Sequence, residues 1–478
     1  MVRAWRVGVA AVVLFLASAI AARAQDGSIV GQVQDEQKGV LPGVTVTAMA
    51  VDTGRQFVDV SNERGEYRLV GLPASRYKVV AELTGFATST LPEVELLVGQ
   101  NATIGFTMKL AGLAENVTVT GEAPLVDTRQ AQVAGNVDRR QMESLPINGR
   151  NWLALSTMVK GVTANTVTDT PGTNRISAFR VNLDGQEITQ ETSVAGFGQP
   201  GISRDAIAEY QIVTNLFDVT MGRSVGLQVQ AVSRSGSNTF TGSTFGNFRS
   251  DKFNAPDVYT KKVLPYSNQQ VGGSQGGPLI KDKLHYFGSY EYQREPNTTV
   301  LGPAVYRGET ISLPSDIYQH MFMGKLDLQL TAIDHLTLRD SGSRWDNPHQ
   351  FATTPTRGAE RYRDSDFANF TWSRVMHSNL LQEVKAGYFM YRFLNVPLAE
   401  GPQGPEYVFP ALTMGANWNY PEDFNQQHFT TSYNLKWHTG QHDFKVGSEI
   451  RVGSDHGWWR ARQRGQMFSS STPADFPS

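Results

Sequence analysis

Two serines stand in a motif that can carry nucleophilic chemistry. Ser224 and Ser274 each lie at the centre of a G-x-S-x-G word, which in α/β-hydrolases forms a sharp turn between a strand and a helix. Here an alternating strand pattern follows Ser224, and Gly277 and Pro278, which begin no helix, follow Ser274. Because the strand–helix context is missing, neither serine is predicted to be a nucleophile.

The sequence also gives little support for thiol chemistry or for a metal site. The chain has no cysteine, which excludes disulfides, thiolate nucleophiles and cysteine-based zinc sites. Four acids with suitable oxygens, Asp35, Glu36, Asp52 and Glu63, each adjoin a turn residue and are interpreted as solvated turns. We therefore predict no catalytic residue, no metal site and no cofactor, and a protein that is not an enzyme.

Length and composition favour a multidomain chain with many turns. At 478 residues it is expected to hold about two to four domains. Its net charge of −2 gives no electrostatic reason to expect a nucleic-acid partner. Charged residues make up 18%, below the roughly 25% of ordinary soluble domains, and the 45 glycines suit frequent turns.

Residues 1–24 are predicted to be a cleaved secretory signal peptide. Arg3 and Arg6 charge its start, Val7–Ala22 is apolar, and Ala22-Arg23-Ala24 is an A-x-A cleavage pattern. The alternative is a membrane anchor, but the apolar run is shorter than the roughly 20 residues of a spanning helix. Any membrane crossing by the mature chain must therefore use strands.

Residues 26–112 alternate short strand patterns with Gly and Pro turns, which predicts a small β-sandwich. The expected strands are Ser28–Val33, Val44–Ala48, Phe57–Val60, Tyr67–Val70, Tyr77–Ala81 and Ala102–Met108. The words Gly31-Gln-Val-Gln-Asp, Leu41-Pro-Gly-Val-Thr-Val and Asn62-Glu-Arg-Gly-Glu-Tyr resemble the carboxypeptidase-regulatory-like domain. That resemblance implies a transthyretin-like sandwich without peptidase chemistry.

The next segment, residues 125–238, has a mixed α/β pattern. We predict a short helix at Arg139–Leu145 and a helical stretch at Arg150–Val159. A strand at Val181–Leu183 should enter an Asp-Gly turn, and Ser203 is expected to cap a further short helix that leads into a strand. These elements fit one compact unit of ordinary domain size.

From residue 239 to residue 478, strand patterns with a period of two take over. Phe429, Tyr433 and Trp437 fall on one face of such a strand, and Ser432 and Asn434 on the other. Nine segments are expected, each of about ten residues. They are Phe240–Arg249, Gln270–Leu279, Leu284–Gln293, Phe322–Leu330, Leu336–Arg344, Phe367–Ser373, Leu380–Tyr391, Phe429–Trp437 and Asp443–Val452.

The connections decide between a barrel and a soluble sandwich, since strands alternate in both. Short turns interleave strictly with long loops. The short turns are Ile280–Lys283, Thr331–His335, Arg374–Asn379 and His438–His442, and the long loops are Ser250–Gln269, Arg294–His320, Trp345–Asp366 and Arg392–His428. Outer-membrane barrels keep their turns short on the periplasmic side and their loops long outside, so part of an antiparallel transmembrane barrel is predicted.

The chain resembles TonB-dependent outer-membrane receptors in several words and in their order. Those that resemble the plug domain are Leu145-Pro-Ile-Asn-Gly-Arg-Asn-Trp, Arg180-Val-Asn-Leu-Asp-Gly-Gln and Leu227-Gln-Val-Gln-Ala-Val. Gly276–Glu291 is similar to the early barrel of the same family. The resemblance implies a mainly β protein, with a small α/β plug at 125–238 inside the barrel. It also implies the outer membrane of a Gram-negative cell envelope, in contact with lipid.

The linker, residues 113–124, holds a β-prone stretch. In receptors of this family a TonB box ahead of the plug pairs with an edge strand of a TonB-type inner-membrane energy transducer, and an extended segment suits such pairing. The residues assigned to this contact by resemblance are Asn116, Val117, Thr118, Val119, Thr120 and Gly121. The same stretch also reads as the last strand of the sandwich or the first strand of the plug.

The sequence departs from the family in its strand number. Bacterial barrels have an even number of strands, about 22 in the plugged transporters, and residues 469–478 read as a loop. An open nine-stranded wall would leave unpaired backbone groups in lipid. The chain is therefore expected to be the N-terminal part of a longer receptor, truncated at its C-terminus.

By resemblance, the expected function is energised uptake of a scarce ligand into the periplasm. The ligand class stays open among siderophore, oligosaccharide, cobalamin and peptide. The alternative is an outer-membrane adhesion or surface-display protein without import. Aromatic residues in the long loops, such as Trp345, Trp418 and Trp459, suit ligand stacking and internal packing equally well, so no ligand-binding residue is assigned.

Overall fold

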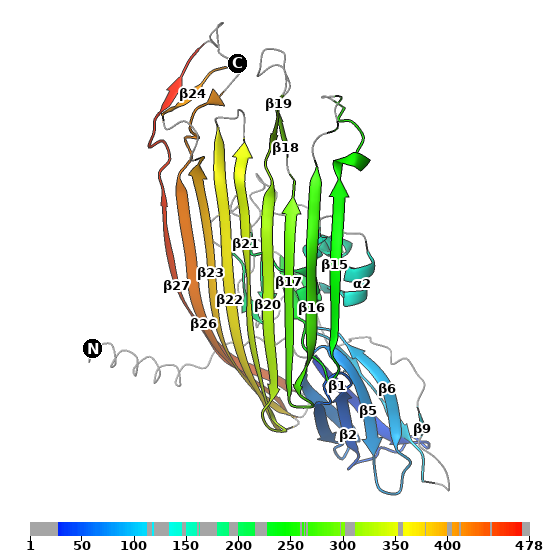
Figure 1. The fold of residues 1–478 in the computed structure, drawn as a ribbon. Coiled ribbons are helices and arrows are strands. Elements are labelled where there is room, and N and C mark those ends of the chain that lie inside the picture. Colours follow the sequence, from blue (N-terminus) through cyan, green and yellow to red (C-terminus); the bar gives the residue numbers. More distant parts are fainter. Residues whose placement is uncertain are drawn as a thin grey trace, which may run out of the picture.

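The chain forms a small sandwich, a mixed central unit and a tall curved wall (Figure 1). The computed structural model describes residues 27–111, 117–118, 133–145, 150–159, 162, 179–190, 199–215, 227–258, 261, 263, 266–296, 298–301, 311–351, 357–377, 379–398, 404–410, 413–439 and 442–470. The predicted signal peptide, residues 1–24, lies outside them. Within these ranges no helix has the length and apolar character needed to cross a membrane.

Two sheets make up the sandwich, in the orders β3-β2-β5-β6-β9 and β4-β1-β7, with β8 also paired to β1. Its strands are β1 (Gly27–Asp35), β2 (Thr45–Ala50), β3 (Gln56–Val60), β4 (Glu66–Leu72), β5 (Ser75–Glu82), β6 (Ser89–Leu96), β7 (Asn101–Thr103), β8 (Phe106–Met108) and β9 (Val117–Thr118). The predicted sandwich is confirmed, but β6 was missed because Pro92 interrupts its pattern.

The strand predicted at Ala102–Met108 is broken in two. Its last residues pair with a later part of β1 than its first residues do, and between them the Tyr67 hydroxyl donates a hydrogen bond to the Ile104 carbonyl at 2.8 Å. Gly31 faces that carbonyl so closely that an added Cβ would overlap it. Glycine is therefore required at this crossing.

The acidic residues beside the sandwich turns have structural partners. Asp35 accepts hydrogen bonds from the backbone N–H groups of Gln37 and Gly39 at 2.9 and 2.7 Å, which closes its own turn. Asp52 pairs with Arg76 at 3.2 Å. No group of three or more His, Asp or Glu side chains in the described ranges is placed to hold a metal ion. The contacts of Asp35 and Asp52 agree with the turn interpretation of these two residues.

The central unit is a five-stranded mixed sheet in the order β10-β13-β14-β11-β12, with short helical turns beside it. Its elements are β10 (Val133–Val137), α2 (Arg139–Ser144), η2 (Trp152–Met158), β11 (Phe179–Leu183), β12 (Gln186–Glu187), η4 (Arg204–Ala206), β13 (Ile207–Asn215) and β14 (Leu227–Ser233). The predicted helix α2 is present and begins with a capping box between Asp138 and Gln141.

Two helical predictions for the central unit need correction. The stretch predicted as helical from Arg150 is a 3₁₀ helix, η2, because the buried residues Trp152 and Leu155 are three apart, a spacing that a 3₁₀ turn satisfies equally well. Ser203 caps its helix as predicted, accepting from the Asp205 N–H. That helix has only three residues, because the strand β13 already begins at Ile207.

The wall is a nine-stranded antiparallel sheet in the order β15-β16-β17-β20-β21-β22-β23-β26-β27. Its strands are β15 (Thr241–Ser250), β16 (Ser267–Ile280), β17 (Leu284–Glu295), β20 (Ile317–Gln329), β21 (Asp334–Phe351), β22 (Gly358–His377), β23 (Leu380–Pro397), β26 (Glu422–Thr439) and β27 (His442–Trp459). All nine predicted strands are therefore confirmed. The connections carry η6 (Asp251–Phe253), β18 (Thr298–Leu301), β19 (Ile311–Pro314), β24 (Glu406–Val408), β25 (Thr413–Met414) and β28 (Gln466–Phe468).

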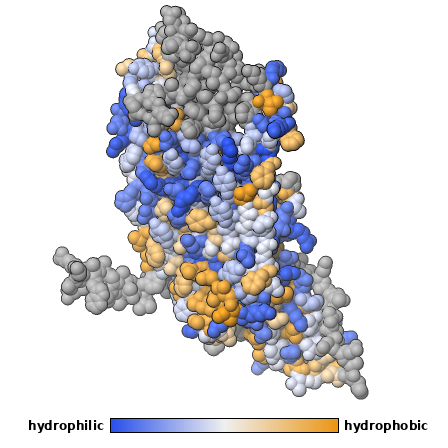
Figure 2. Space-filling view, viewed as in Figure 1, coloured by the Kyte–Doolittle hydropathy of each residue, from blue (hydrophilic) through white to orange (hydrophobic). Residues whose placement is uncertain are grey.

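Away from the core shared with the central unit, as along β26, polar side chains of the wall face inward and apolar ones outward. On β26, Asn434 is 1% exposed, while Phe429 and Trp437 are 51% and 45% exposed. Trp437 stacks on Phe444 of β27 near the short turns, at 5.5 Å between ring centroids. Hydrophobic surface gathers on the lower part of the wall, and hydrophilic surface lies above it (Figure 2). This inverted pattern is typical of a sheet whose outer face meets lipid.

The strands are longer than predicted, and the loops correspondingly shorter. β22 has 20 residues, and the loop predicted at Trp345–Asp366 shrinks to residues 352–357. Above the hydrophobic band the outer face is hydrophilic (Figure 2), so apolar alternation fades there while strand pairing continues. Arg344 on β21 there donates two hydrogen bonds to Asp366 on β22, each at 2.9 Å.

An arginine on the outer face of the wall should destabilise it far more than one on the inner face. We predict that Ile450→Arg lowers the free energy of unfolding of the protein in phospholipid bilayers by about 2–4 kcal/mol, because a charge then enters the hydrocarbon. Lys445→Arg, on the opposite face of the same strand, should change it little. Denaturant titration in bilayers measures both variants, and equal midpoints would contradict the assigned faces.

Candidate functional site

The central unit lies against the inner face of the wall and shares a hydrophobic core with it (Figure 1). Trp152 and Tyr210 stack edge to face in this core, and the Tyr210 hydroxyl donates to the Trp152 carbonyl at 2.8 Å. The wall contributes Phe367, Phe389, Tyr391 and Phe393 to the same cluster. The two parts therefore cannot separate without exposing aromatic surface to water.

Arg150 makes the first charged contact between the central unit and the wall. Its Nε lies 3.0 Å from Oε1 of Glu291 on β17, and its Nη2 lies 3.2 Å from Asp205 in η4. The Ser203 hydroxyl donates to the other Glu291 oxygen at 2.6 Å. The guanidinium also stacks on Phe245 of β15 at 3.6 Å. Glu291 is only 1% exposed, so these partners compensate for the loss of hydration of its carboxylate.

Asp184 makes the second charged contact. Its Oδ2 lies 3.2 Å from Nε of Arg339 on β21, a side chain with no exposed surface. Arg339 also donates to Gln186 Oε1 at 2.7 Å, while its Nη1 has no hydrogen-bond partner among the described residues. Ser233 donates to Asp184 through its N–H and its hydroxyl, at 2.9 and 2.6 Å. Lys325 of β20 donates to that same hydroxyl at 3.0 Å.

The charge on Asp184 is maintained by its surroundings. Burial alone would raise the pKa of this carboxyl, but Lys325, Arg339 and the hydrogen bonds from Ser233 outweigh it and hold the pKa below its usual value. We name the Arg150–Glu291 and Asp184–Arg339 contacts the lumen ion pairs. Together they fix one face of the central unit to the wall strands.

Tight turns present both central-unit members of these pairs. Arg150 and Asp184 have positive φ values of 55° and 51°, and Asp184 is followed by Gly185 at 81°, the Asp-Gly turn that the sequence predicts. Such turns place a side chain outside the unit rather than in its own core. Arg150 and Asp184 both lie in recognisable sequence motifs. Their partners Glu291 and Arg339 lie far along the chain, so no local sequence pattern indicates the two ion pairs.

Only part of the transducer-binding assignment falls on described residues. Val117 and Thr118 form β9, which pairs in parallel with Ser89 and Thr90 of β6 at the edge of the sandwich. Asn116, Val119, Thr120 and Gly121 lie outside the described residues. The segment thus occupies the place of a last sandwich strand, and its contact with a transducer stays a prediction.

Ser274 and the aromatic residues considered for ligand binding make contacts with other residues of the protein. Ser274 lies in the middle of β16, with Ser243 and Arg234 as its hydrogen-bond neighbours, so it has no elbow geometry. Ser224 lies outside the described residues. The loop aromatics engage the protein itself: Arg363 stacks on Trp345 at 4.3 Å, and Trp459 donates to the Asn419 carbonyl at 2.9 Å.

Comparison with known families matches both ends of the chain. Residues 28–109 match the carboxypeptidase regulatory-like domain family. Residues 232–305 and 296–475 match the outer membrane beta barrel domain family.

Similar proteins include the TonB-dependent transporter Oar of Myxococcus xanthus, which is 25% identical over 289 residues. That alignment covers 56% of this chain and 27% of Oar. Among solved structures, the outer membrane transporter YddB of Escherichia coli matches with a TM-score of 0.51 and 12% identity, over 68% of this chain and 48% of that one. The siderophore receptor PirA of Acinetobacter baumannii gives a TM-score of 0.46, at 17% identity over 67% of this chain and 48% of its own. The chain thus spans about a quarter of Oar and about half of each solved chain.

Removal of the Glu291 carboxylate should loosen the central unit within the wall. Glu291→Ala removes the wall carboxylate from the buried Arg150 guanidinium and leaves it only Asp205 of the central unit, so the cost is expected to lie below the roughly 3–5 kcal/mol of a fully broken buried pair. We expect hydrogen exchange of central-unit amides to accelerate while wall amides keep their protection.

The matched control is Arg76→Ala, which breaks exposed ion pairs on the sandwich. Such surface pairs contribute at most about 1 kcal/mol. Unchanged exchange in Glu291→Ala would show that the pair does not hold the central unit.

Proposed function

Because this chain belongs to the outer membrane β-barrel domain family, we propose that it acts as a TonB-dependent receptor that imports a scarce solute across the outer membrane. In this proposal the central unit is the plug, and a periplasmic transducer pulls on the residues that precede it. The outer membrane holds no nucleotide supply, so the pull carries energy from the inner membrane. Similarity to the TonB-dependent transporter Oar supports the proposal.

The observation that carries the proposal is the way the central unit is held. Two buried ion pairs and a shared aromatic core join it to the inner face of the wall. A buried ion pair stabilises little net, because desolvation offsets the attraction. The free Nη1 of Arg339 shows that this desolvation is only partly compensated by described residues. Such contacts specify one position of the unit and still permit its release under force.

A pull on the linker would act first on the strand of the central sheet that follows it. The linker leads into β10, which is an edge strand and pairs only with β13 within the described sheet. Force applied to residues 113–132 therefore reaches β10 first and can peel it from β13 one residue pair at a time. β13 carries Tyr210 of the shared core, so displacement of this edge reaches the contact with the wall.

Deletion of Asn116–Gly121 should abolish uptake while leaving the receptor in the outer membrane. A panel of labelled ferric siderophores, cobalamin, oligosaccharides and peptides is offered to producer cells with and without the gene, and the compound lost with the gene is followed. We expect the deletion variant, like cells treated with a protonophore, to bind that compound at the surface without accumulating it.

A deletion of equal length, residues 125–130, leaves the assigned segment intact and serves as the control. Accumulation that persists without Asn116–Gly121 would assign transducer contact elsewhere. If no compound depends on the gene, the adhesion or display alternative is favoured.

A further inference from the structure

The sandwich is an independent body with a complete core of its own. Its buried cluster, which includes Ile29, Val46, Tyr77 and Phe106, contains sandwich residues only. The cluster of the central unit, in contrast, continues into the wall. Among the described residues, therefore, the sandwich can move away without opening a hydrophobic core, whereas the central unit cannot.

The sandwich touches the short-turn end of the wall through a few contacts, two of them polar and one apolar. The Asn238 N–H donates to the Asp52 carbonyl at 2.8 Å. Arg68 Nη1 lies 3.1 Å from Nδ1 of His438, near the end of β26. Gly71 packs against Leu381 at the start of β23. The His438 and Leu381 contacts lie side by side on the paired strands β23 and β26, and the Asn238 contact is made by the segment that precedes β15.

A fourth contact joins the sandwich to the central unit. The turn after β6 lies over the β10–β13 edge, where the Val98 N–H donates to the Glu209 carboxylate and the Val98 carbonyl accepts from Asn136 at 3.1 Å. Burial, together with the nearby charges of Glu95 and Asp138, raises the pKa of Glu209 to about 8. Because a buried carboxylate is costly to keep ionised, this contact adds specificity more than strength.

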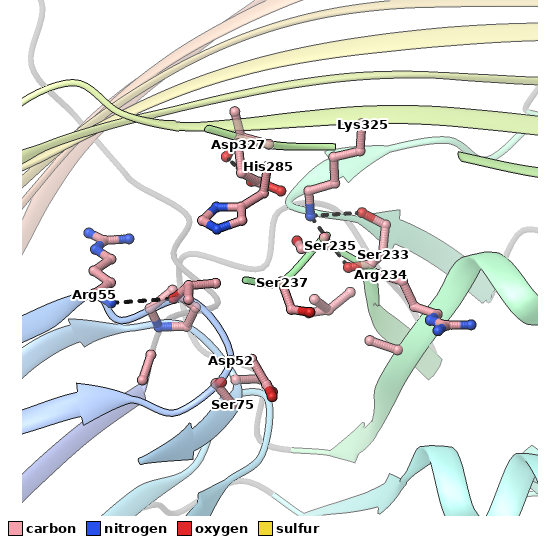
Figure 3. A pocket seen from close by; sticks show the side chains of 18 of the residues that line it. Asp52, Arg55, Ser75, Ser233, Arg234, Ser235, Ser237, His285, Lys325 and Asp327 are labelled. Carbon is pink, nitrogen blue, oxygen red and sulfur yellow. Dashed lines mark hydrogen bonds between the residues drawn. The ribbon is translucent and has the colours of Figure 1, made fainter. Parts of the chain in front are cut away.

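A cavity of about 800 Å³ lies between the three parts. Figure 3 shows Asp52 and Arg55 of the sandwich on one side, Ser233 and Arg234 of the central unit on another, and the wall opposite them. His285, Lys325 and Asp327 supply the labelled side chains of the wall. Hydroxyl-bearing and charged side chains alternate with apolar surface in this lining. The sandwich borders the cavity at the end of the wall where the turns are short, and the cavity is partly open to solvent.

We propose that the sandwich is a detachable lid over this cavity, seated by the Asp52–Asn238, Arg68–His438, Gly71–Leu381 and Val98–Glu209 contacts. When the lid lifts, the space between the central unit and the wall opens toward the short-turn side. This inference depends on the proposed transport function in one respect only, namely the direction in which a solute passes. The sandwich therefore has a mechanical role at the exit, in addition to any role in binding partners.

The lid can be tested by the rate at which a buried thiol is labelled. Ser373 on β22 lines the cavity and is 8% exposed, so Ser373→Cys is a small change in a chain without cysteine. The full chain in lipid nanodiscs is treated with a maleimide carried on polyethylene glycol. Neither ligand nor transducer is needed, so the outcome is separate from that of the uptake experiments.

The lid is locked with a second pair of cysteines, Asp52→Cys and Asn238→Cys. The backbone hydrogen bond between these residues brings their Cα atoms within the span of a disulfide. We expect oxidation of this pair to slow labelling at residue 373 at least tenfold, and reduction to restore the rate. Arg68→Ala combined with Glu209→Ala, which removes two seating contacts, should accelerate labelling several-fold.

Glu63→Cys in an exposed sandwich turn is the reactivity control and should be labelled equally fast in every background. If the maleimide labels residue 373 as fast in the locked protein as in the unlocked one, the lid proposal is wrong, whether both rates are fast or both are slow. Two fast rates would mean that the docked sandwich does not close the cavity. Two slow rates would mean that it never lifts.

Discussion

The structure depends on one constraint, the inversion of polarity across the wall. A sheet whose outer face is apolar must turn its polar side chains inward, and there each buried charge needs a partner. Glu291 and Arg339 are such side chains, 1% and 0% exposed. Their partners, Arg150 and Asp184, come from the central unit. The wall and the central unit therefore complete each other, and the aromatic core between them adds hydrophobic stabilisation.

The central unit and the sandwich are held against the wall in different ways. The central unit shares ion pairs and a core with the wall, whereas the sandwich keeps its core to itself and adds polar contacts at the turn end. A pull on the linker acts between them, because β9 ends the sandwich sheet and β10 begins the central one. The sandwich can therefore yield at a lower force than the central unit, which would open the exit before the inner passage changes.

Much of this architecture could be predicted from sequence, because the wall strands alternate on two faces and the turns carry Gly, Pro and Asp. All nine wall strands were found in this way. Their lengths were underestimated, since pairs such as Arg344–Asp366 continue the sheet above the apolar band. The lumen ion pairs were missed because each joins residues distant in sequence, and the local pattern marks Arg150 only as the start of a helical stretch and Asp184 only as a turn residue. The Trp152–Leu155 spacing fitted an α and a 3₁₀ helix equally.

The central claim is that the central unit must move within the wall for import, and a reversible cross-link between them tests it most directly. A Cβ added at Gly201 would lie 3.3 Å from the Cβ of Ser343 on β21, close to the separation in a disulfide. The variant Gly201→Cys with Ser343→Cys is assayed for uptake of the compound that depends on the gene, with Ser343→Cys alone as the control. The account predicts that oxidation abolishes accumulation but not surface binding, and that reduction restores it. Full accumulation by the cross-linked protein would contradict the account.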